Sequence, residues 1–168
     1  MLPLKNKGLF LEEILNLTHN HYLQTNQALV NKIPTNIKMF KKTGDIIHQA
    51  VFSPGSNCDY VGIYHGVYLE FEAKETYDSV FKYQNLRKNQ INELDQVINH
   101  RGLAFVIIYF DIVEKFFLID WRVLKTHFSK TKKTIPWEWF TQFGHELKLD
   151  HHLCLDYLPA LNYLINCI

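Results

Sequence analysis

The chain has 168 residues, of which 47% are hydrophobic and 21% charged, with a formal net charge of +1; these values suit one soluble globular domain over residues 1–168. Its three cysteines, Cys58, Cys154 and Cys167, lack Cys-x-x-Cys spacing, so they indicate neither a disulfide framework nor a zinc knuckle. No stretch approaches the ~20 apolar residues of a membrane span, and the first residues lack the features of a signal peptide. We therefore expect a cytoplasmic protein without a membrane partner.

The first predicted element is a helix from Gly8 to about Gln27, because its apolar residues recur at helical spacing. Its expected inward positions are Leu11, Ile14, Leu15 and Leu17. Glu12 lies on the polar side of this helix. A short strand over residues 28–33 follows and stops at Pro34, since proline cannot donate to a strand ladder.

Residues 36–56 carry Lys, Gly and Pro around two short apolar pieces. We interpret them as an excursion from the core, either an extended arm or a long hairpin. This region holds Lys38, Lys41 and Lys42 within a stretch that contains no acid. Such a run is usually a solvated loop, and the functional alternative is that its lysines neutralise phosphates.

The remaining elements are two strands, a helix, two more strands and then helices. Strands are predicted over residues 59–64, 67–73, 103–110 and 115–120, and helices over residues 84–99, 121–128 and a short piece after Pro136. The continuously apolar strand 103–110 is expected to be buried on both faces. This order predicts an α/β fold with a central mixed β-sheet flanked by helices.

The candidate chemistry lies in a predicted hairpin whose turn is at residues 65–66, His-Gly, a pair that accepts the positive φ angles of two-residue turns. Counting outward from this turn places Asp59 opposite Glu72, with Cβ atoms ~5 Å apart. Lys74 lies two residues beyond Glu72 and therefore projects from the same face of the sheet. Asn57 does likewise if the strand extends back that far.

Two acids and a lysine on one sheet face are typical of metal-dependent phosphodiester cleavage. Like charges placed opposite one another destabilise a hairpin, whereas Mg²⁺ binds carboxylate oxygens together with waters and phosphates. The metal would activate a water, and Lys74 would position that water or stabilise the charge that develops on the phosphate. The alternative is an ordinary surface hairpin, and the spacing alone favours neither.

Two further polar residues are candidates for the same site. Glu12 is a candidate catalytic residue that would approach the metal through a water. A solvated glutamate on the helix surface is the simpler interpretation. Gln90 lies on the helix that follows the hairpin. An ordinary glutamine on the surface of that helix would not indicate a site. His151-His152 with Cys154 lack a spaced partner pair and are not favoured as a metal site.

The sequence resembles the RecU Holliday junction resolvases, which belong to the restriction-endonuclease-like nuclease superfamily. The most specific match covers residues 58–76, with Asp-Tyr, Gly62, Gly66 and Phe-Glu-Ala-Lys-Glu-Thr. Other similar motifs are Lys7-Gly8…Leu11-Glu12, Lys32…Pro34-Thr35 and Leu155-Asp156-Tyr157-Leu158. The resemblance covers nearly the whole chain.

The resemblance implies a restriction-endonuclease-like core and an Mg²⁺-dependent endonuclease that binds four-way DNA junctions as a homodimer. Such an enzyme cuts two strands symmetrically in homologous recombination and repair; the sequence leaves open whether Mn²⁺ substitutes. Proteins of this family are also thought to modulate the strand-exchange recombinase. A DNA-binding recombination factor with little or no cleavage is therefore an alternative, and a nuclease that cuts other DNA is another.

The resemblance also implies roles for individual residues. Asp59 and Glu72 would be metal ligands, and Lys74 would be the catalytic lysine. Gln90 falls where the family has a metal-associated glutamine, and Asn57 where it has a threonine, so both are candidate metal ligands. Because the acid–acid–lysine core is intact, we expect activity.

Residues 36–56 would be the family's stalk, which projects into the centre of the junction. Lys38, Lys41 and Lys42 would then contact the DNA backbone, and Lys7 is the fourth residue expected to contact DNA. The longer basic segment that usually precedes the family's first helix is nearly absent here.

Overall fold

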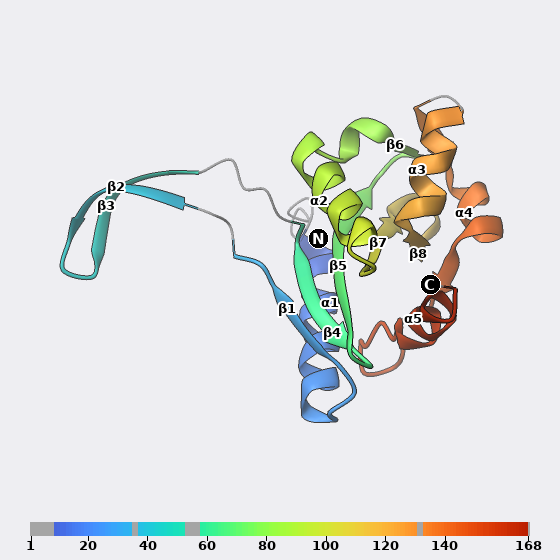
Figure 1. Ribbon diagram of the computed structural model, residues 1–168, viewed down its shortest axis with the longest axis horizontal. Helices are drawn as coiled ribbons and strands as arrows, with labels where there is room; N and C mark the ends of the chain where they lie inside the picture. The colour runs from blue at the N-terminus through green and yellow to red at the C-terminus, as the bar shows by residue number, and fades with distance from the viewer. Residues whose placement is uncertain (1–8, 35–36, 53–57, 131–132, 168) are drawn as a thin grey trace, which may run out of the picture.

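The computed structural model describes residues 9–34, 37–52, 58–130 and 133–167. Two of the candidate residues, Lys7 and Asn57, lie outside this part of the chain. The described residues form a sheet with helices on both faces, and a two-stranded hairpin projects from it (Figure 1). This arrangement confirms the predicted α/β class and the predicted projecting stalk.

The central sheet is mixed and has six strands. In spatial order they are β1 (Leu29–Lys32), β4 (Tyr60–Tyr64), β5 (Val67–Thr76), β7 (Leu103–Phe110), β8 (Lys115–Asp120) and β10 (His145–Leu147). Strands β5 and β7 pair in parallel, and the other neighbours pair antiparallel. The parallel pair is joined through a helix, as parallel neighbours require, and this crossover carries part of the candidate site.

One face of the sheet is covered by α1 (Leu9–Gln24) and α5 (Leu158–Ile165). Their apolar stripes pack against the sheet side chains that point to this face, such as Phe71 and Phe105, which are fully buried. Leu17, which was expected to point inward, is 50% exposed. That prediction was wrong because Leu17 lies off the buried stripe of α1, which is formed by Leu11, Ile14, Leu15, Thr18, His19 and Tyr22.

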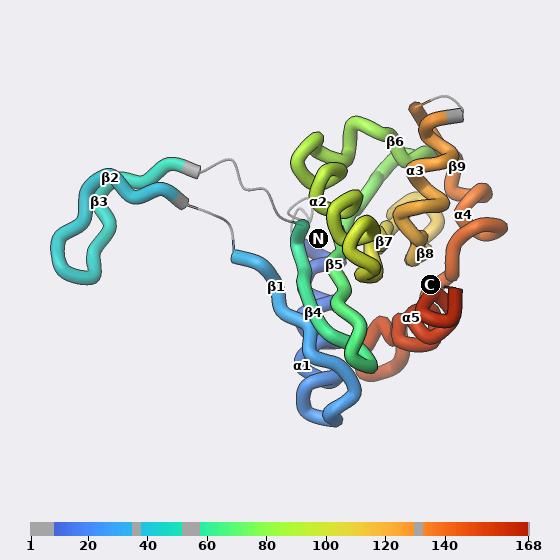
Figure 2. The backbone as a smooth tube through the Cα atoms, viewed as in Figure 1, coloured from blue at the N-terminus to red at the C-terminus, as the bar shows by residue number. Residues whose placement is uncertain are grey.

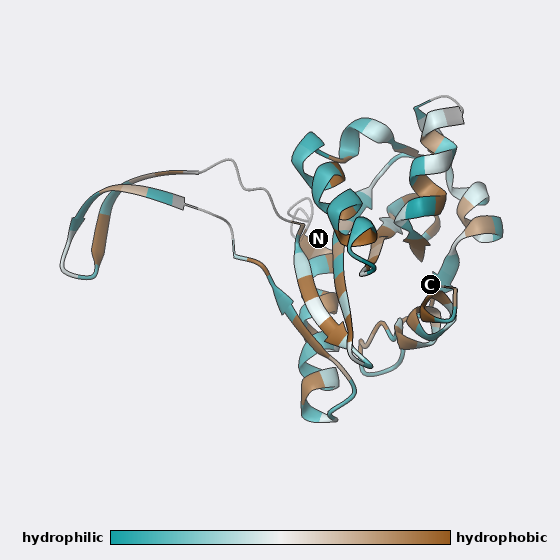
Figure 3. Ribbon diagram, viewed as in Figure 1, coloured by the Kyte–Doolittle hydropathy of each residue, from teal (hydrophilic) through white to brown (hydrophobic). Residues whose placement is uncertain are grey.

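The opposite face is covered by α2 (Lys88–Asn99), α3 (Trp121–Lys130) and α4 (Trp137–Phe143). The hydrophilic sides of these helices face outward and their hydrophobic sides face the sheet (Figure 3). All eight residues of β7 are buried, which confirms the strand expected to be covered on both faces.

Several short elements have no counterpart in the sequence prediction. A small sheet pairs β6 (Val80–Lys82) with β9 (Thr134–Pro136), and 3-10 turns occur at Tyr83–Asn85 and Asp111–Val113. The helix predicted over residues 84–99 begins later, at Lys88, because the 3-10 turn occupies its expected first turn. None of the described helices is long and apolar enough to cross a membrane.

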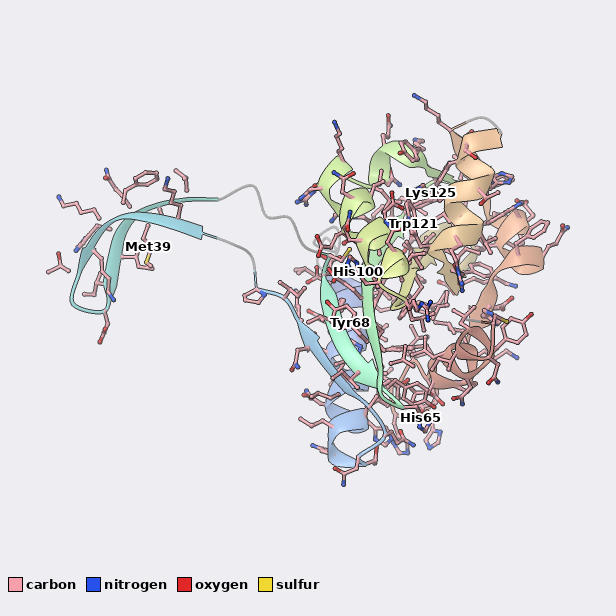
Figure 4. The ribbon with its side chains drawn as sticks, viewed as in Figure 1. Met39, His65, Tyr68, His100, Trp121 and Lys125 are labelled. Carbon is pink, nitrogen blue, oxygen red and sulfur yellow. The ribbon has the colours of Figure 1, made fainter. Side chains whose placement is uncertain are left out.

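The projecting segment is a hairpin of β2 (Ile37–Thr43) and β3 (Ile46–Phe52), with Gly44 in its turn at a φ of +59°. It extends away from the sheet, as the backbone path makes clear (Figures 1 and 2). The side chain of Met39 is accordingly exposed on it (Figure 4). Of the two alternatives for this region, the long hairpin is confirmed.

Candidate active site

The candidate site is built on the hairpin of β4 and β5. His65 and Gly66 form its turn with φ angles of +49° and +78°, and the pairing runs from Tyr64↔Val67 outward. This is the register that the turn predicted. Asp59 directly precedes β4, and its Oδ2 accepts a hydrogen bond from the backbone N–H of Ala73 at 3.1 Å, so the acid is held at the end of the hairpin.

Glu72 and Lys74 project from the α2 face of β5, while Phe71 and Ala73 point toward α1. Glu72 is fully buried. The Lys74 Nζ donates to Glu72 Oε1 at 2.5 Å, and the Lys74 side chain keeps 17% of its surface exposed. The lysine therefore pairs with the buried acid and remains partly open to solvent.

Gln90 joins the helix to this acid. It lies in the first turn of α2 and is 2% exposed. Its Nε2 donates to Glu72 Oε1 at 2.5 Å, and its Oε1 accepts from the backbone N–H of Arg87 at 2.9 Å. Both ends of the amide are thus engaged, which fixes the orientation of the Glu72 carboxylate.

The electrostatics of Glu72 fit a cation site. Burial, and next the charge of Asp59, raise the pKa of the Glu72 carboxyl to about 8. Its Oε2 is buried and has no hydrogen-bond partner among the described residues. A buried carboxylate oxygen without a partner is costly unless a cation is near, and Mg²⁺ prefers carboxylate oxygens such as those of Asp59 and Glu72.

These groups open into a cavity of about 310 Å³. Its lining residues are Leu11, Glu12, Asp59, Glu72, Ala73, Lys74, Glu75 and Arg87. Glu12 comes from α1 and pairs with Lys32 of β1, so the structure brings it to the same cavity as the two acids. Glu75 Oε1 accepts from the backbone N–H of Leu11 at 2.6 Å, which ties the start of α1 to β5.

The sequence did not single out two of these lining residues, Glu75 and Arg87. Glu75 directly follows Lys74, and strand alternation turns it toward the opposite face, where it binds the start of α1. Arg87 directly precedes α2. The signal that could have found Arg87 is its position three residues before Gln90, at the boundary where the helix meets the site.

The stalk lysines do not approach this cavity. Lys38, Lys41 and Lys42 lie on β2 and are exposed on the projecting hairpin. Lys7 and Asn57 lie outside the described residues. The structure therefore brings together Asp59, Glu72, Lys74, Gln90 and Glu12, and leaves the three lysines on a separate surface.

A larger cavity of about 530 Å³ lies at the other end of α2. It is lined in part by Tyr68, Glu70 and His100; Figure 4 labels Tyr68 and His100. Both oxygens of Glu70 accept hydrogen bonds, from Tyr68 Oη at 2.8 Å and from the Cys58 backbone N–H at 3.3 Å. Because its buried acid already has partners, this cavity lacks the unmatched group that marks the smaller one.

The chain is similar to two proteins named Holliday junction resolvase RecU. It is 34% identical over 169 residues to the Holliday junction resolvase RecU of Oceanobacillus iheyensis, covering 95% of this chain and 86% of the relative. It is 36% identical over 167 residues to the protein of the same name from Bacillus cereus strain AH820, covering 94% and 84%.

The fold is similar to the solved structure of Hjc from Archaeoglobus fulgidus, described as a Holliday junction resolvase from an archaeal hyperthermophile. The TM-score is 0.51 at 16% identity, covering 83% of this chain and 95% of that chain. This similarity confirms the restriction-endonuclease-like core.

The family model for RecU, described as Recombination protein U, matches residues 6–163. The chain therefore belongs to the RecU family.

Proposed function

We propose that this protein is a Holliday junction resolvase, an endonuclease that makes paired symmetric cuts in four-way DNA junctions with Mg²⁺ as its cofactor. The observation that carries the proposal is the buried Glu72, with one unmatched oxygen, beside Asp59 and Lys74 in a cavity open to solvent. The names of the relatives from O. iheyensis and B. cereus support the choice of substrate.

Asp59 and Glu72 would hold the metal ion. When bound, Mg²⁺ supplies Lewis-acid polarisation of the scissile phosphate and a water of lowered pKa. The Gln90 oxygen is engaged by Arg87 N, which favours a role for Gln90 in orienting Glu72. Asn57 remains a candidate ligand on sequence grounds.

The chain's own residues would act on the phosphate and the water. Lys74 lines the cavity, and 17% of its side-chain surface is exposed; there it would stabilise negative charge that develops on the phosphate oxygens. Glu12 also lines the cavity and pairs with Lys32, and its carboxylate would accept a hydrogen bond from a water in the cavity.

The substrate would be selected by the hairpin of β2 and β3. A basic hairpin that projects from the body would meet the open centre of a four-way junction, whereas a continuous duplex lying across the cavity would clash with it. Lys38, Lys41 and Lys42 would neutralise backbone phosphates there.

The protein would act as a homodimer, because two cuts across a two-fold substrate require two sites. Exposed apolar side chains supply surface that a second copy would cover. One row crosses three neighbouring strands through Leu29, Ile63 and Tyr68, which are 47%, 50% and 45% exposed. The hairpin adds Met39, Phe40, Ile46, Ile47 and Val51.

The test compares a labelled four-way junction with a linear duplex of the same sequence, in the presence and absence of Mg²⁺. We expect the wild type to cut the junction only with metal, and Asp59→Asn and Lys74→Ala to bind it without cutting. Equal cleavage of the duplex would instead indicate a nuclease for other DNA. Junction binding without any cleavage would indicate a recombination factor, whose partner would be the strand-exchange recombinase.

A further inference from the structure

Arg87 lines the active-site cavity together with Asp59 and Lys74. It is the residue directly before α2, and its side chain is exposed. Within the part of the chain that the structure describes, no carboxylate lies within ion-pair distance of its guanidinium. A permanently charged group therefore faces the cavity without a matching charge.

The carboxylates around the cavity are already engaged with other groups. Glu12 pairs with Lys32, Glu72 with Lys74, and Glu75 accepts the hydrogen bond from the start of α1. Asp59 accepts from the backbone of β5. Arg87 is thus the cavity's cationic side chain that is left to bind an incoming anion.

The position of Arg87 is coupled to the acid that would hold the metal. Its backbone N–H donates to Gln90 Oε1 at 2.9 Å, and Gln90 Nε2 donates to Glu72 Oε1 at 2.5 Å. One buried side chain therefore holds both the backbone of Arg87 and the carboxylate of Glu72. This link sets the position of the Arg87 backbone relative to the Glu72 carboxylate.

We propose that Arg87 binds the phosphate next to the scissile phosphate on the DNA strand that is cut; this rests on the proposed endonuclease function. Lys74 lies deeper, hydrogen-bonded to Glu72, and is the cation nearer to the reacting group. Arg87 is at the exposed rim, where the strand enters or leaves. Its planar guanidinium binds two phosphate oxygens at once, so it sets the register of the strand over the metal site.

The first test uses three variants on a Mg²⁺-dependent junction cleavage assay. Arg87→Ala is expected to lower kcat/KM about ten- to hundredfold, since it removes hydrogen bonds to a charged group. Arg87→Lys keeps the charge but loses the two-oxygen contact and should fall between Arg87→Ala and wild type. Lys88→Ala removes the next cation along the chain, which is exposed and does not line the cavity, and should leave cleavage unchanged.

The second test identifies the phosphate. Each of the two phosphates that flank the scissile one is replaced in turn by a neutral methylphosphonate. At one of the two positions, the methylphosphonate should lower the activity of the wild type as much as Arg87→Ala lowers activity on the unmodified junction. The same methylphosphonate should cause no further loss in the Arg87→Ala variant. A purely structural role would give independent, additive losses at both positions, and that result would overturn the proposal.

The same substrates are also used in a binding assay without metal. This assay distinguishes failure of the proposed endonuclease function from failure of the proposed role of Arg87. Wild type that binds but never cuts contradicts the endonuclease function, while the matched loss in binding at one phosphate would still support Arg87 as its ligand. If the wild type cuts normally and the Arg87→Ala variant cuts and binds equally well, the proposed role of Arg87 is contradicted and the endonuclease function is not.

Discussion

Gln90 Nε2 lies 2.5 Å from Glu72 Oε1, and this hydrogen bond joins the first turn of α2 to β5. Both residues are almost fully buried. Since Lys74 donates to the same oxygen, the carboxylate is held through Oε1, while its Oε2 has no hydrogen-bond partner among the described residues. The helix that links the two parallel strands thereby sets the orientation of a residue that would bind Mg²⁺.

Removal of this amide should weaken metal binding more than it weakens DNA binding. For Gln90→Leu we expect half-maximal cleavage at an Mg²⁺ concentration about 10–100 times higher, the range found when partners of metal ligands are lost. Gln96→Leu, at an exposed position on the same helix, is the matched control. An unchanged Mg²⁺ requirement for Gln90→Leu would contradict the orienting role.

Glu72→Gln should stabilise the metal-free protein at alkaline pH. The folded pKa of Glu72, about 8, lies above its ordinary value of 4.5, so the folded state retains a proton that the unfolded state releases. The free energy of unfolding therefore falls as pH rises between these values, by up to about 1.4 kcal/mol per pH unit, and the glutamine removes this loss.

Thermal unfolding at several pH values measures this effect. Mg²⁺ should raise the Tm of the wild type at pH 8, because binding to the folded state stabilises it. It should leave the Tm of Glu72→Gln nearly unchanged. An equal Mg²⁺ shift in both proteins would place the metal elsewhere.

His19, which does not line the cavity, gives the fold a second dependence on pH. It is 6% exposed, its Nε2 lies 2.8 Å from Tyr157 Oη, and burial lowers its pKa from 6.5 to about 3. Below pH 6.5 the unfolded state takes up a proton that the folded state does not, so stability falls as pH falls through that window. Between pH 7.5 and 5.5 the loss is about 1.4 kcal/mol.

His19→Gln should lack this portion of the pH dependence in denaturant unfolding. His21→Gln, at an exposed position of the same helix, should retain it. If the two variants lose stability in parallel between pH 7.5 and 5.5, His19 does not carry the effect.

The lysines of the hairpin should contribute to junction binding and not to the chemical step. Replacing Lys38, Lys41 and Lys42 by alanine removes three exposed charges, which should reduce the slope of log K against log salt concentration by up to about 2.7. With saturating junction, the cleavage rate should change little. Lys148→Ala, at an exposed position away from the hairpin, should alter the slope much less; an unchanged slope for the triple variant would exclude the proposed contacts.

Much of the site could be predicted because it depends on local rules. The His65-Gly66 turn sets the register of β4 and β5, and that register determines which side chains share a face. The apolar run of β7 likewise identified a strand covered on both faces, with its bounds as predicted. These features follow from a few neighbouring residues.

Other features depend on distant contacts that leave no periodic pattern. Strands β6, β9 and β10 have three residues each, too few for an alternation to be recognised. Helix α5 was not predicted as a separate element, and it joins the hydrophobic cluster of α1 only in the folded chain. The location of Arg87 in the cavity depends on the hydrogen bond from its backbone to Gln90, which in the sequence corresponds only to a spacing of three residues.

The most direct measurement of the central claim uses a supercoiled plasmid with an extruded cruciform, incubated with wild type and Asp59→Asn with and without Mg²⁺. Two coordinated cuts across one junction convert the plasmid to a linear product, whereas uncoordinated single cuts give nicked circles. We predict linear product with wild type and Mg²⁺ alone, and none with Asp59→Asn, which should still bind the cruciform. Linear product from Asp59→Asn, or cleavage by wild type without any divalent metal, would contradict the account.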